Sequence, residues 1–406
     1  MGVLMKDISD NHNFKSNIGL WPMLLLMFFV TVSFSVSAED AEWKYRRNSL
    51  YNIMILHPEY KFGEELEQIF GTMPLPERFN DHSLGVRTVK FAESDRNDQR
   101  DNIERFLAKT GLARRMVSRW FNRNKQDGSF DVSLIEERGY YDAGLDDINN
   151  ARASARGMAL LADAGEELIG NTYVVFNDVI YNSRSGVGSI LKMFGNVYVG
   201  NVDGVQSNMQ EIAGFKVTIK SYLYRLVWDD ETAARFYNDY YYDANSLDPA
   251  KKSAFETANS QFKLKYVGVA ESSSQKTSFT GVKSPEDALR KECTRVIDRN
   301  LSDLQHAFPD FRIKAPLVST EPLVVDIGLK EGISRDSRFE VLQVEISEDG
   351  KLKYKRAGII RPVEGKIKDN RYMAVEEGAE NSLLPGTEFE KVSGDDFYPG
   401  MLVREM

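Results

Sequence analysis

The pattern of apolar residues changes near residue 309, and this change constrains the fold more than any other feature of the chain. Between residues 50 and 308, segments with helical spacing are interspersed with short apolar or alternating segments typical of strands. After the proline-containing residues 309–322, only short strand-like segments follow. We therefore predict an α+β chain: an α/β layered domain over residues 39–308 with helices on a mixed sheet, a linker over 309–322, and a small C-terminal antiparallel β-barrel-like domain over 323–406.

The predicted strands of the α/β domain are short apolar runs, or alternate as Phe215, Val217 and Ile219 do with polar residues. We place these strands at residues 50–56, 130–136, 173–181, 214–228 and 262–270. Helical spacing places helices at residues 62–70, 103–121, 149–168, 230–240 and 285–308. Ser284 and Pro285 suit the cap and first position of the last helix. Cys293 falls on the apolar face of that helix, which predicts a small core residue.

The C-terminal domain contains the stretch VVDIGLKEGISRDSRFEVL, residues 324–342, which we predict to be a corner between two strands. A phosphate loop leads into a helix, whereas this stretch leads into alternating β-formers. A calcium loop needs closely spaced oxygens, whereas Asp326, Glu331 and Asp336 stand five residues apart. Gly328 and Gly332 are therefore interpreted as structural turn residues. The predicted strands are residues 323–327, 338–346, 352–361, 388–392 and 401–404.

The N-terminus predicts export. The apolar residues 20–30 lead to Val36 and Ala38, small residues at the −3 and −1 positions of a signal peptide cleaved after Ala38. The alternative is an uncleaved N-terminal anchor, because the residues before the apolar core carry no net charge. No cysteine follows the core, so no lipid-anchored form is expected. We predict an exported protein in the periplasm or associated with the outer membrane.

Charge argues against nucleic acid as a partner, because the chain carries a net charge of −9. One segment is locally basic: residues 105–125 contain no acidic residue. This amphipathic segment is a candidate site for binding an anionic membrane surface or an acidic partner. The alternative is that its apolar face packs on the sheet and its arginines are solvated. The candidate residues are Arg114, Arg115, Arg119, Trp120 and Arg123.

Catalytic and metal sites are not predicted. After cleavage the histidines are His57, His82 and His306, and none stands beside a nucleophile motif or has the spacing of a metal site. Asn80, Asp81 and His82 are interpreted as a surface turn, with a metal site as the alternative. Residues 183–204 are Gly-rich without the ending of a phosphate loop; a hairpin, a mobile loop and a membrane-contacting segment remain open. We expect no enzyme activity and no cofactor.

Residues 130–181 resemble the curli secretion channel family and the related N-terminal domain of the translocation protein TolB. In these proteins a strand is followed by a "vER..l" segment, a helix and a second strand, and residues 135–138 and 171–180 take the corresponding positions. The sequence has no counterpart of the acylated cysteine of the curli family.

The C-terminal stretch is similar to the β-domain of the flagellar assembly protein T family. The match lies at Gly328, Gly332, Ile333, Phe339 and Val341. These families act in assembly, secretion or interaction, so no catalytic residue is carried over.

Together the resemblances imply an envelope protein of a Gram-negative bacterium of the Bacteroidota type. We predict an exported non-enzymatic protein that acts by protein binding or assembly at the periplasm or outer membrane. Its expected partners are other envelope proteins, with self-association and peripheral membrane contact included. Two alternatives stay open: a subunit of an outer-membrane pore, in which residues 214–228 form a membrane hairpin, and a periplasmic enzyme.

Overall fold

The computed structural model describes residues 48–57, 63–92, 99–139, 168–180, 217–274, 285–346 and 352–406. The predicted signal peptide, nearly all of the predicted helix at residues 149–168, and the Gly-rich residues 183–204 lie outside these ranges. Within them the chain forms helices and two sheets, the α+β class that the sequence predicts.

The first sheet is mixed. Its strands run in the order β2-β1-β4-β5-β6, with β3 also paired to β1. β2, β3 and β4 are parallel to β1, whereas β5 and β6 continue the sheet in antiparallel pairs. The strands are β1 (Ser49–Leu56), β2 (Asn80–Asp81), β3 (Thr88–Lys90), β4 (Thr172–Ile180), β5 (Thr218–Leu226) and β6 (Leu264–Ser273).

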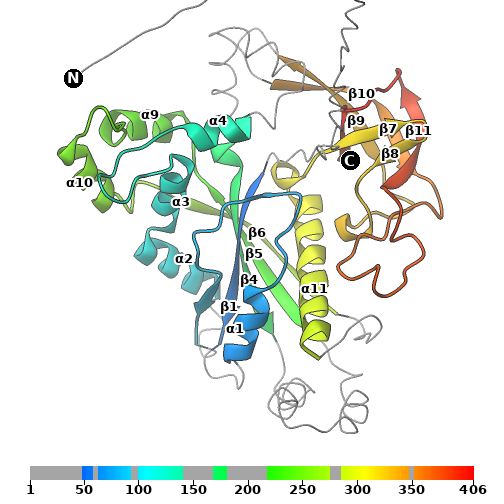
Figure 1. Cartoon of the computed structure of the whole chain (residues 1–406), viewed down its shortest axis with the longest axis horizontal. Coiled ribbons are helices and arrows are strands. Elements are labelled where there is room, and N and C mark those ends of the chain that lie inside the picture. The colour runs from blue at the N-terminus through cyan, green and yellow to red at the C-terminus, as the bar shows by residue number, and fades with distance from the viewer. Residues whose placement is uncertain are drawn as a thin grey trace, which may run out of the picture. The chain divides into compact units, whose positions relative to one another are not determined.

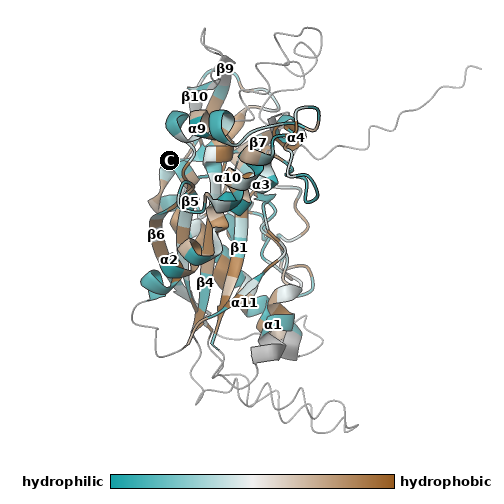
Figure 2. Cartoon of the chain, turned by 90° about the vertical axis from the view of Figure 1, so that its left-hand side faces the viewer, coloured by the Kyte–Doolittle hydropathy of each residue, from teal (hydrophilic) through white to brown (hydrophobic). Residues whose placement is uncertain are grey.

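Both faces of this sheet are covered by helices, which explains why every residue of β1 is buried and most of them are apolar (Figure 2). One face packs against α1 and α11, and the other against α2 and α3, which lie on the opposite side of the sheet from α11 in Figure 1. The helices are α1 (Gly63–Gly71), α2 (Gln99–Thr110), α3 (Leu112–Trp120), α4 (Ser133–Gly139), α9 (Asp230–Asp239), α10 (Pro249–Thr257) and α11 (Pro285–Ala307).

Two predicted elements of this layer are wrong. The helix expected at residues 103–121 is divided into α2 and α3 by Gly111, whose φ of +57° interrupts the helix. The strand expected at residues 130–136 is the helix α4. The Asp131 carboxylate accepts a hydrogen bond from the Ser133 backbone N–H (3.0 Å) and so caps the first turn of that helix.

The second sheet is antiparallel and barrel-like. Its strands pair in the order β10-β11-β8-β7-β12-β9, and β9 pairs again with β10. Apolar side chains from these strands form a separate core, in which the rings of Phe339 and Phe389 meet edge to face with their centroids 5.2 Å apart. The strands are β7 (Ala315–Thr320), β8 (Leu323–Val325), β9 (Phe339–Ile346), β10 (Leu352–Pro362), β11 (Thr387–Gly394) and β12 (Leu402–Glu405).

The residues expected to form a linker, 309–322, include the strand β7, so part of this segment belongs to the second sheet. Pro316 has no N–H to donate, but the neighbouring Leu317 N–H donates to the Met401 carbonyl (2.8 Å) and holds the strand in the sheet. By packing, both sheets belong to one unit, Trp43–Met406.

The glycine stretch forms a corner between β8 and β9 that includes the short 3-10 turn η4 (Leu329–Glu331). Gly332 has φ +77°, and a Cβ there would lie 2.3 Å from Ser302 Oγ on α11. Gly328 is extended, but a Cβ would lie 2.3 Å from the Lys368 carbonyl oxygen. Glycine is therefore required at position 328 because a side chain would not fit. At position 332 it is required both because a side chain would not fit and because the backbone is left-handed.

Candidate binding groove at the edge of β3

A groove of about 310 Å³ opens between β3 and the helices α2 and α3. Its volume is in the range of small ligand sites. We call it the β3 groove; its lining residues are Tyr51, Ile53, Val86, Thr88, Val89, Lys90, Phe106, Thr110, Leu112 and Arg115.

The groove follows the outer edge of β3. Successive side chains of a strand point to opposite faces of a sheet, yet Thr88, Val89 and Lys90 all line the groove. Val89 packs in the core under α2 and α3, whereas the Thr88 hydroxyl donates to Glu67 Oε1 of α1 (2.7 Å). In the described part of the chain β3 pairs only with β1, so its other edge borders the groove.

The α2–α3 turn forms the facing wall. Gly111 ends α2 and lets the chain start α3 at once, which brings Thr110 and Leu112 to the groove. A Cβ at Gly111 would lie 2.2 Å from Asn259 Oδ1, so the turn packs tightly. Phe106 on α2 packs edge to face against Phe176 of β4, with centroids 6.0 Å apart.

Most polar groups of the groove already have partners. The Tyr51 hydroxyl donates to the Val86 carbonyl, and the Thr110 hydroxyl donates to the Phe106 carbonyl (2.8 Å). Lys90 Nζ lies 3.3 Å from Glu67 Oε2, in an ion pair between two exposed side chains.

Arg115 differs from these groups. Its half-buried guanidinium makes no hydrogen bond or ion pair with any residue in the described part of the chain. Its charge acts on Tyr51: burial raises the pKa of the Tyr51 phenol, and Arg115 opposes that rise. The groove therefore presents an apolar surface next to one cation whose hydrogen-bond donors are unused.

The other predicted site residues do not join Arg115. The Arg114 Nε–H donates to Asn259 Oδ1 (2.8 Å), an Arg119 Nη2–H to the Asp81 carbonyl (3.0 Å), and an Arg123 Nη2–H to Glu256 Oε1 (3.2 Å). These arginines hold neighbouring segments together.

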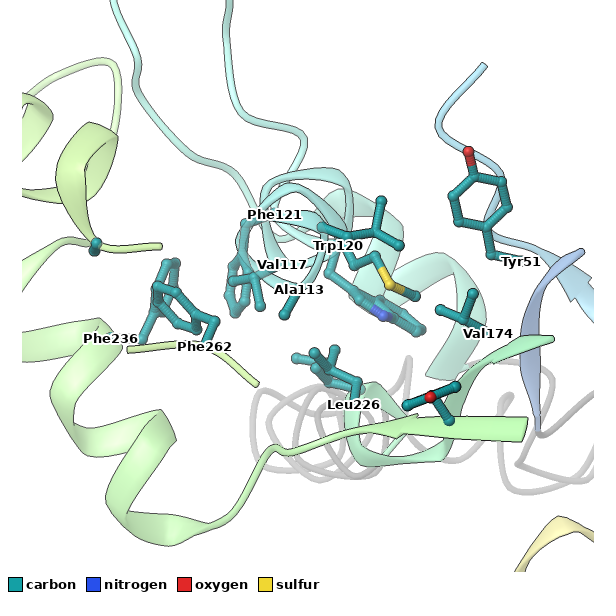
Figure 3. Close-up of a cluster of buried hydrophobic side chains, with 14 of the residues drawn as sticks. Tyr51, Ala113, Val117, Trp120, Phe121, Val174, Leu226, Phe236 and Phe262 are labelled. Atoms are coloured by element: carbon teal, nitrogen blue, oxygen red, sulfur yellow. The ribbon is translucent and has the colours of Figure 1, made fainter. Parts of the chain in front are cut away.

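Trp120 is corrected as a binding residue. Its side chain is fully buried, and its indole N–H donates to the Thr172 hydroxyl (2.8 Å). Figure 3 shows Trp120 and Phe121 within the apolar cluster between α3 and the sheet. The apolar face of this segment packs on the sheet, because burial of its aromatic side chains stabilises the fold more than their exposure would.

The histidines lie apart from the groove lining. His82 is fully buried; its Nε2–H donates to the Met116 carbonyl (3.0 Å), and its Nδ1 accepts from Arg138 (3.1 Å). Burial and the charge of Arg138 hold the pKa of His82 well below its usual range. The surface turn expected at residues 80–82 is therefore wrong: Asn80 and Asp81 form β2, and His82 enters the core.

His57 forms a buried pair with Asp178, with 2.7 Å between Nε2 and Oδ1. Its Nδ1–H donates to the Phe91 carbonyl (3.1 Å). Because a carbonyl only accepts hydrogen bonds, Nδ1 is the donor in this contact. The pair ties the ends of β1 and β4 together.

Cys293 on α11 is fully buried in the core between this helix and the first sheet, as predicted, and burial raises the pKa of its thiol. A neutral thiol is a weak nucleophile. Among the described residues no group of three or more His, Cys, Asp or Glu side chains has the arrangement of a metal site, and no helix there is long and apolar enough to cross a membrane.

The sequence interpretation did not include the β3 residues. The signal was present: residues 86–91 (VRTVKF) contain three β-branched residues and one aromatic residue, a composition typical of a strand. The run is short and lies between polar segments, which conceals it.

No model of a known protein family matches this sequence, and no curated protein matches it. The interpretation of the groove rests on its own chemistry.

Proposed function

We propose that this chain is an exported, non-enzymatic protein of the cell envelope that binds other envelope proteins, and that the β3 groove is a surface for that binding. The observation that carries the proposal is the unpaired Arg115 guanidinium beside an open apolar groove. A charged hydrogen bond contributes about 1.5–3 kcal/mol, so a carboxylate of a partner would gain from this site.

Binding is favoured over nucleophilic catalysis by the state of the reactive side chains in the described residues. His57 and His82 are buried and hold hydrogen bonds through both ring nitrogens. Cys293 is a buried neutral thiol. His306 is partly exposed, and its Nε2 lies 2.6 Å from Glu405 Oε2. His57, His82 and Cys293 are therefore not available as a base or nucleophile for a substrate.

The pore alternative is not favoured. It requires residues 214–228 to form a hairpin with one face in lipid. In the structure β5 (Thr218–Leu226) lies between β4 and β6, and Ile219 and Leu223 pack in the core next to α11.

Export is tested by fractionating cells that make the full chain and sequencing the N-terminus of the product. We expect a mature chain that starts at Glu39 in the envelope fraction. A full-length product that stays in the cytoplasm would overturn the proposed location.

Partner binding is tested by replacing Val86 with a photoreactive amino acid in cells. Val86 lines the groove and is 47% exposed; the matched control is Val269 on β6, which is 41% exposed and outside the groove. We expect crosslinks to an envelope protein from position 86, lost when Arg115→Glu is added. Equal crosslinking from both positions, or none from position 86, would contradict the proposed use of the groove.

A further inference from the structure

We infer that the β3 groove binds an extended acidic segment of a partner protein by adding it as a strand to the outer edge of β3. This inference rests on the proposed binding function and specifies how the groove recognises its partner. Three features support it: the free backbone edge, the apolar floor and Arg115.

The free edge follows from the pairing of β3 with β1. The Met54 N–H donates to the Arg87 carbonyl (2.9 Å), and the Phe91 N–H donates to the Leu56 carbonyl (3.0 Å). Because backbone groups alternate in direction along a strand, the N–H and C=O groups of Thr88 and Lys90 point away from β1. They point to the edge along which the groove runs, and an extended peptide can pair with them.

The side chains beside this edge specify the peptide. An added strand would place every second side chain on the face of Val89, above the groove floor formed with Phe106 and Leu112. Arg115 lies at the same wall. The matching segment therefore carries an apolar side chain and a carboxylate two positions apart, so that one fills the floor and the other pairs with Arg115.

The opposite edge of the sheet is built against such pairing. On β6 the register shifts opposite Leu223 and Tyr224, and the exposed Lys265 and Glu271 place charges along the strand. Bulges and edge charges are common protections of sheet edges. β3 has no bulge, its charged side chain Lys90 is held in an ion pair with Glu67, and no strand in the described residues covers its outer edge, which favours β3 as the docking edge.

The inference is tested with the mature chain and a synthetic peptide, acetyl-Thr-Val-Thr-Glu-Thr-Val-Thr-amide, whose valines and glutamate share one face. Binding is measured by fluorescence polarisation, and hydrogen exchange is followed at the amides of Thr88 and Lys90. We expect binding that slows exchange at both amides. A peptide with lysine in place of glutamate should bind about tenfold more weakly or worse.

Two pairs of variants separate charge from backbone pairing. Arg115→Glu should weaken peptide binding about tenfold or more, whereas Lys109→Glu, an equal charge change at an exposed position of α2 outside the groove, should leave it unchanged. Thr88→Pro removes an outward N–H and should abolish binding. Thr88→Val loses the same hydroxyl but keeps the N–H, and should bind like the original protein.

Each remaining outcome overturns the inference. Peptide binding that depends on Arg115 without slower exchange at Thr88 and Lys90 would exclude strand addition but leave the proposed function intact. Absence of binding at millimolar peptide would also overturn it, and crosslinking from position 86 then decides separately whether the proposed function survives. Valerate binding as tightly as the peptide would assign the groove to a small carboxylic acid, and a crosslink between two copies of this chain would assign it to self-association.

Discussion

At the scale of single residues, buried charges differ in how well they are satisfied. Arg138 donates to the Ser49 hydroxyl (2.8 Å) and the Asp81 carbonyl (3.0 Å), and its guanidinium lies 4.5 Å from the centre of a Trp120 ring. Asp298 on α11 is the opposite case, because its Oδ2 is buried and has no hydrogen-bond partner. A buried carboxylate with an unsatisfied oxygen favours its neutral form.

Asp298 should make stability depend on pH. Burial raises its pKa to about 6; Lys330 opposes this rise, and Glu331 and Glu77 add to it. A raised folded-state pKa gives stability that is present below the unfolded value of 3.8 and lost as the pH rises through about 6. Asp298→Asn should therefore raise the free energy of unfolding at pH 7 by about 2–3 kcal/mol and change it little at pH 4.

The measurement is urea denaturation of the original protein and of Asp298→Asn between pH 4 and pH 7. Asp303→Asn, at an exposed position of the same helix, is the control and should show no comparable gain. An Asp298→Asn variant that is less stable at pH 7 would mean that the carboxylate has a structural role as an ion.

At the scale of elements, the break between α2 and α3 positions the groove wall. Gly111 at φ +57° separates two helices whose residues would otherwise continue one amphipathic pattern. Without the break, α3 would continue the axis of α2, and Arg115 would leave the groove. The conformation of a single residue thus determines where the unpaired cation lies.

Gly111→Ala should destabilise the protein by two separable effects. The left-handed backbone costs about 1–2 kcal/mol for a residue with a Cβ, and that Cβ would also meet the Asn259 side chain. Thermal denaturation of Gly111→Ala, Asn259→Ala and the double variant separates the backbone effect from the steric effect. We expect the double variant to lose less than the sum of the single losses; full additivity would exclude the steric effect.

Elements with a strong local pattern could be predicted from the sequence. The periodic helix α11 and the alternating strand β5 are found where their residues predict them. α4 could not be predicted, because its apolar residues suit either a strand or a short helix and the Asp131 cap decides between them. β7 was concealed by Pro316, although it pairs with the neighbouring β8 as well as with β12, which lies far along the chain.

The groove was less predictable than the fold. Arg115 was among the predicted binding residues, but its distinction from Arg114 depends on Asn259, which is 145 residues away. Sequence spacing on one helix cannot show which arginines find partners on other elements. The position of β3 beside the α2–α3 turn is likewise a result of tertiary packing.

At the scale of the whole molecule, α11 contacts both sheets. Its apolar face belongs to the core of the first sheet, while its polar face holds segments of the barrel-like region. Glu377 accepts hydrogen bonds from Lys291 Nζ (2.9 Å) and Arg295 Nη2 (2.7 Å). The Ser302 hydroxyl donates to the Glu331 carbonyl (3.0 Å) next to the glycine corner. These polar contacts join regions that have separate apolar cores.

Glu377→Ala should weaken this junction, because the fully buried Lys291 would lose a carboxylate partner. We expect a loss of about 2 kcal/mol in the free energy of unfolding. Glu376→Ala, at an exposed neighbouring position, should cost little. Adding Lys291→Met should restore part of the loss; no restoration would show that Glu377 acts through other contacts.

The domain boundary at residues 309–322 remains a prediction that limited proteolysis can test. Cleavage there should release a stable C-terminal fragment if the barrel-like sheet folds by itself. A fragment that is degraded further would instead mean that its contacts with α11 are needed for its stability. Glu377→Ala should then increase the rate of cleavage.

The parallel pairing of β1 with β4 has a consequence for the order of folding. Ser49 pairs with Thr172, a separation of 172 minus 49, or 123 residues. Contacts so distant in sequence form slowly, since a long loop must close before they stabilise the chain. As the chain is made from its N-terminus, β1 can pair with β2 and β3 early, but its other edge stays unpaired until β4 has been synthesised. This interval is when the protein is most prone to aggregate and most in need of a chaperone.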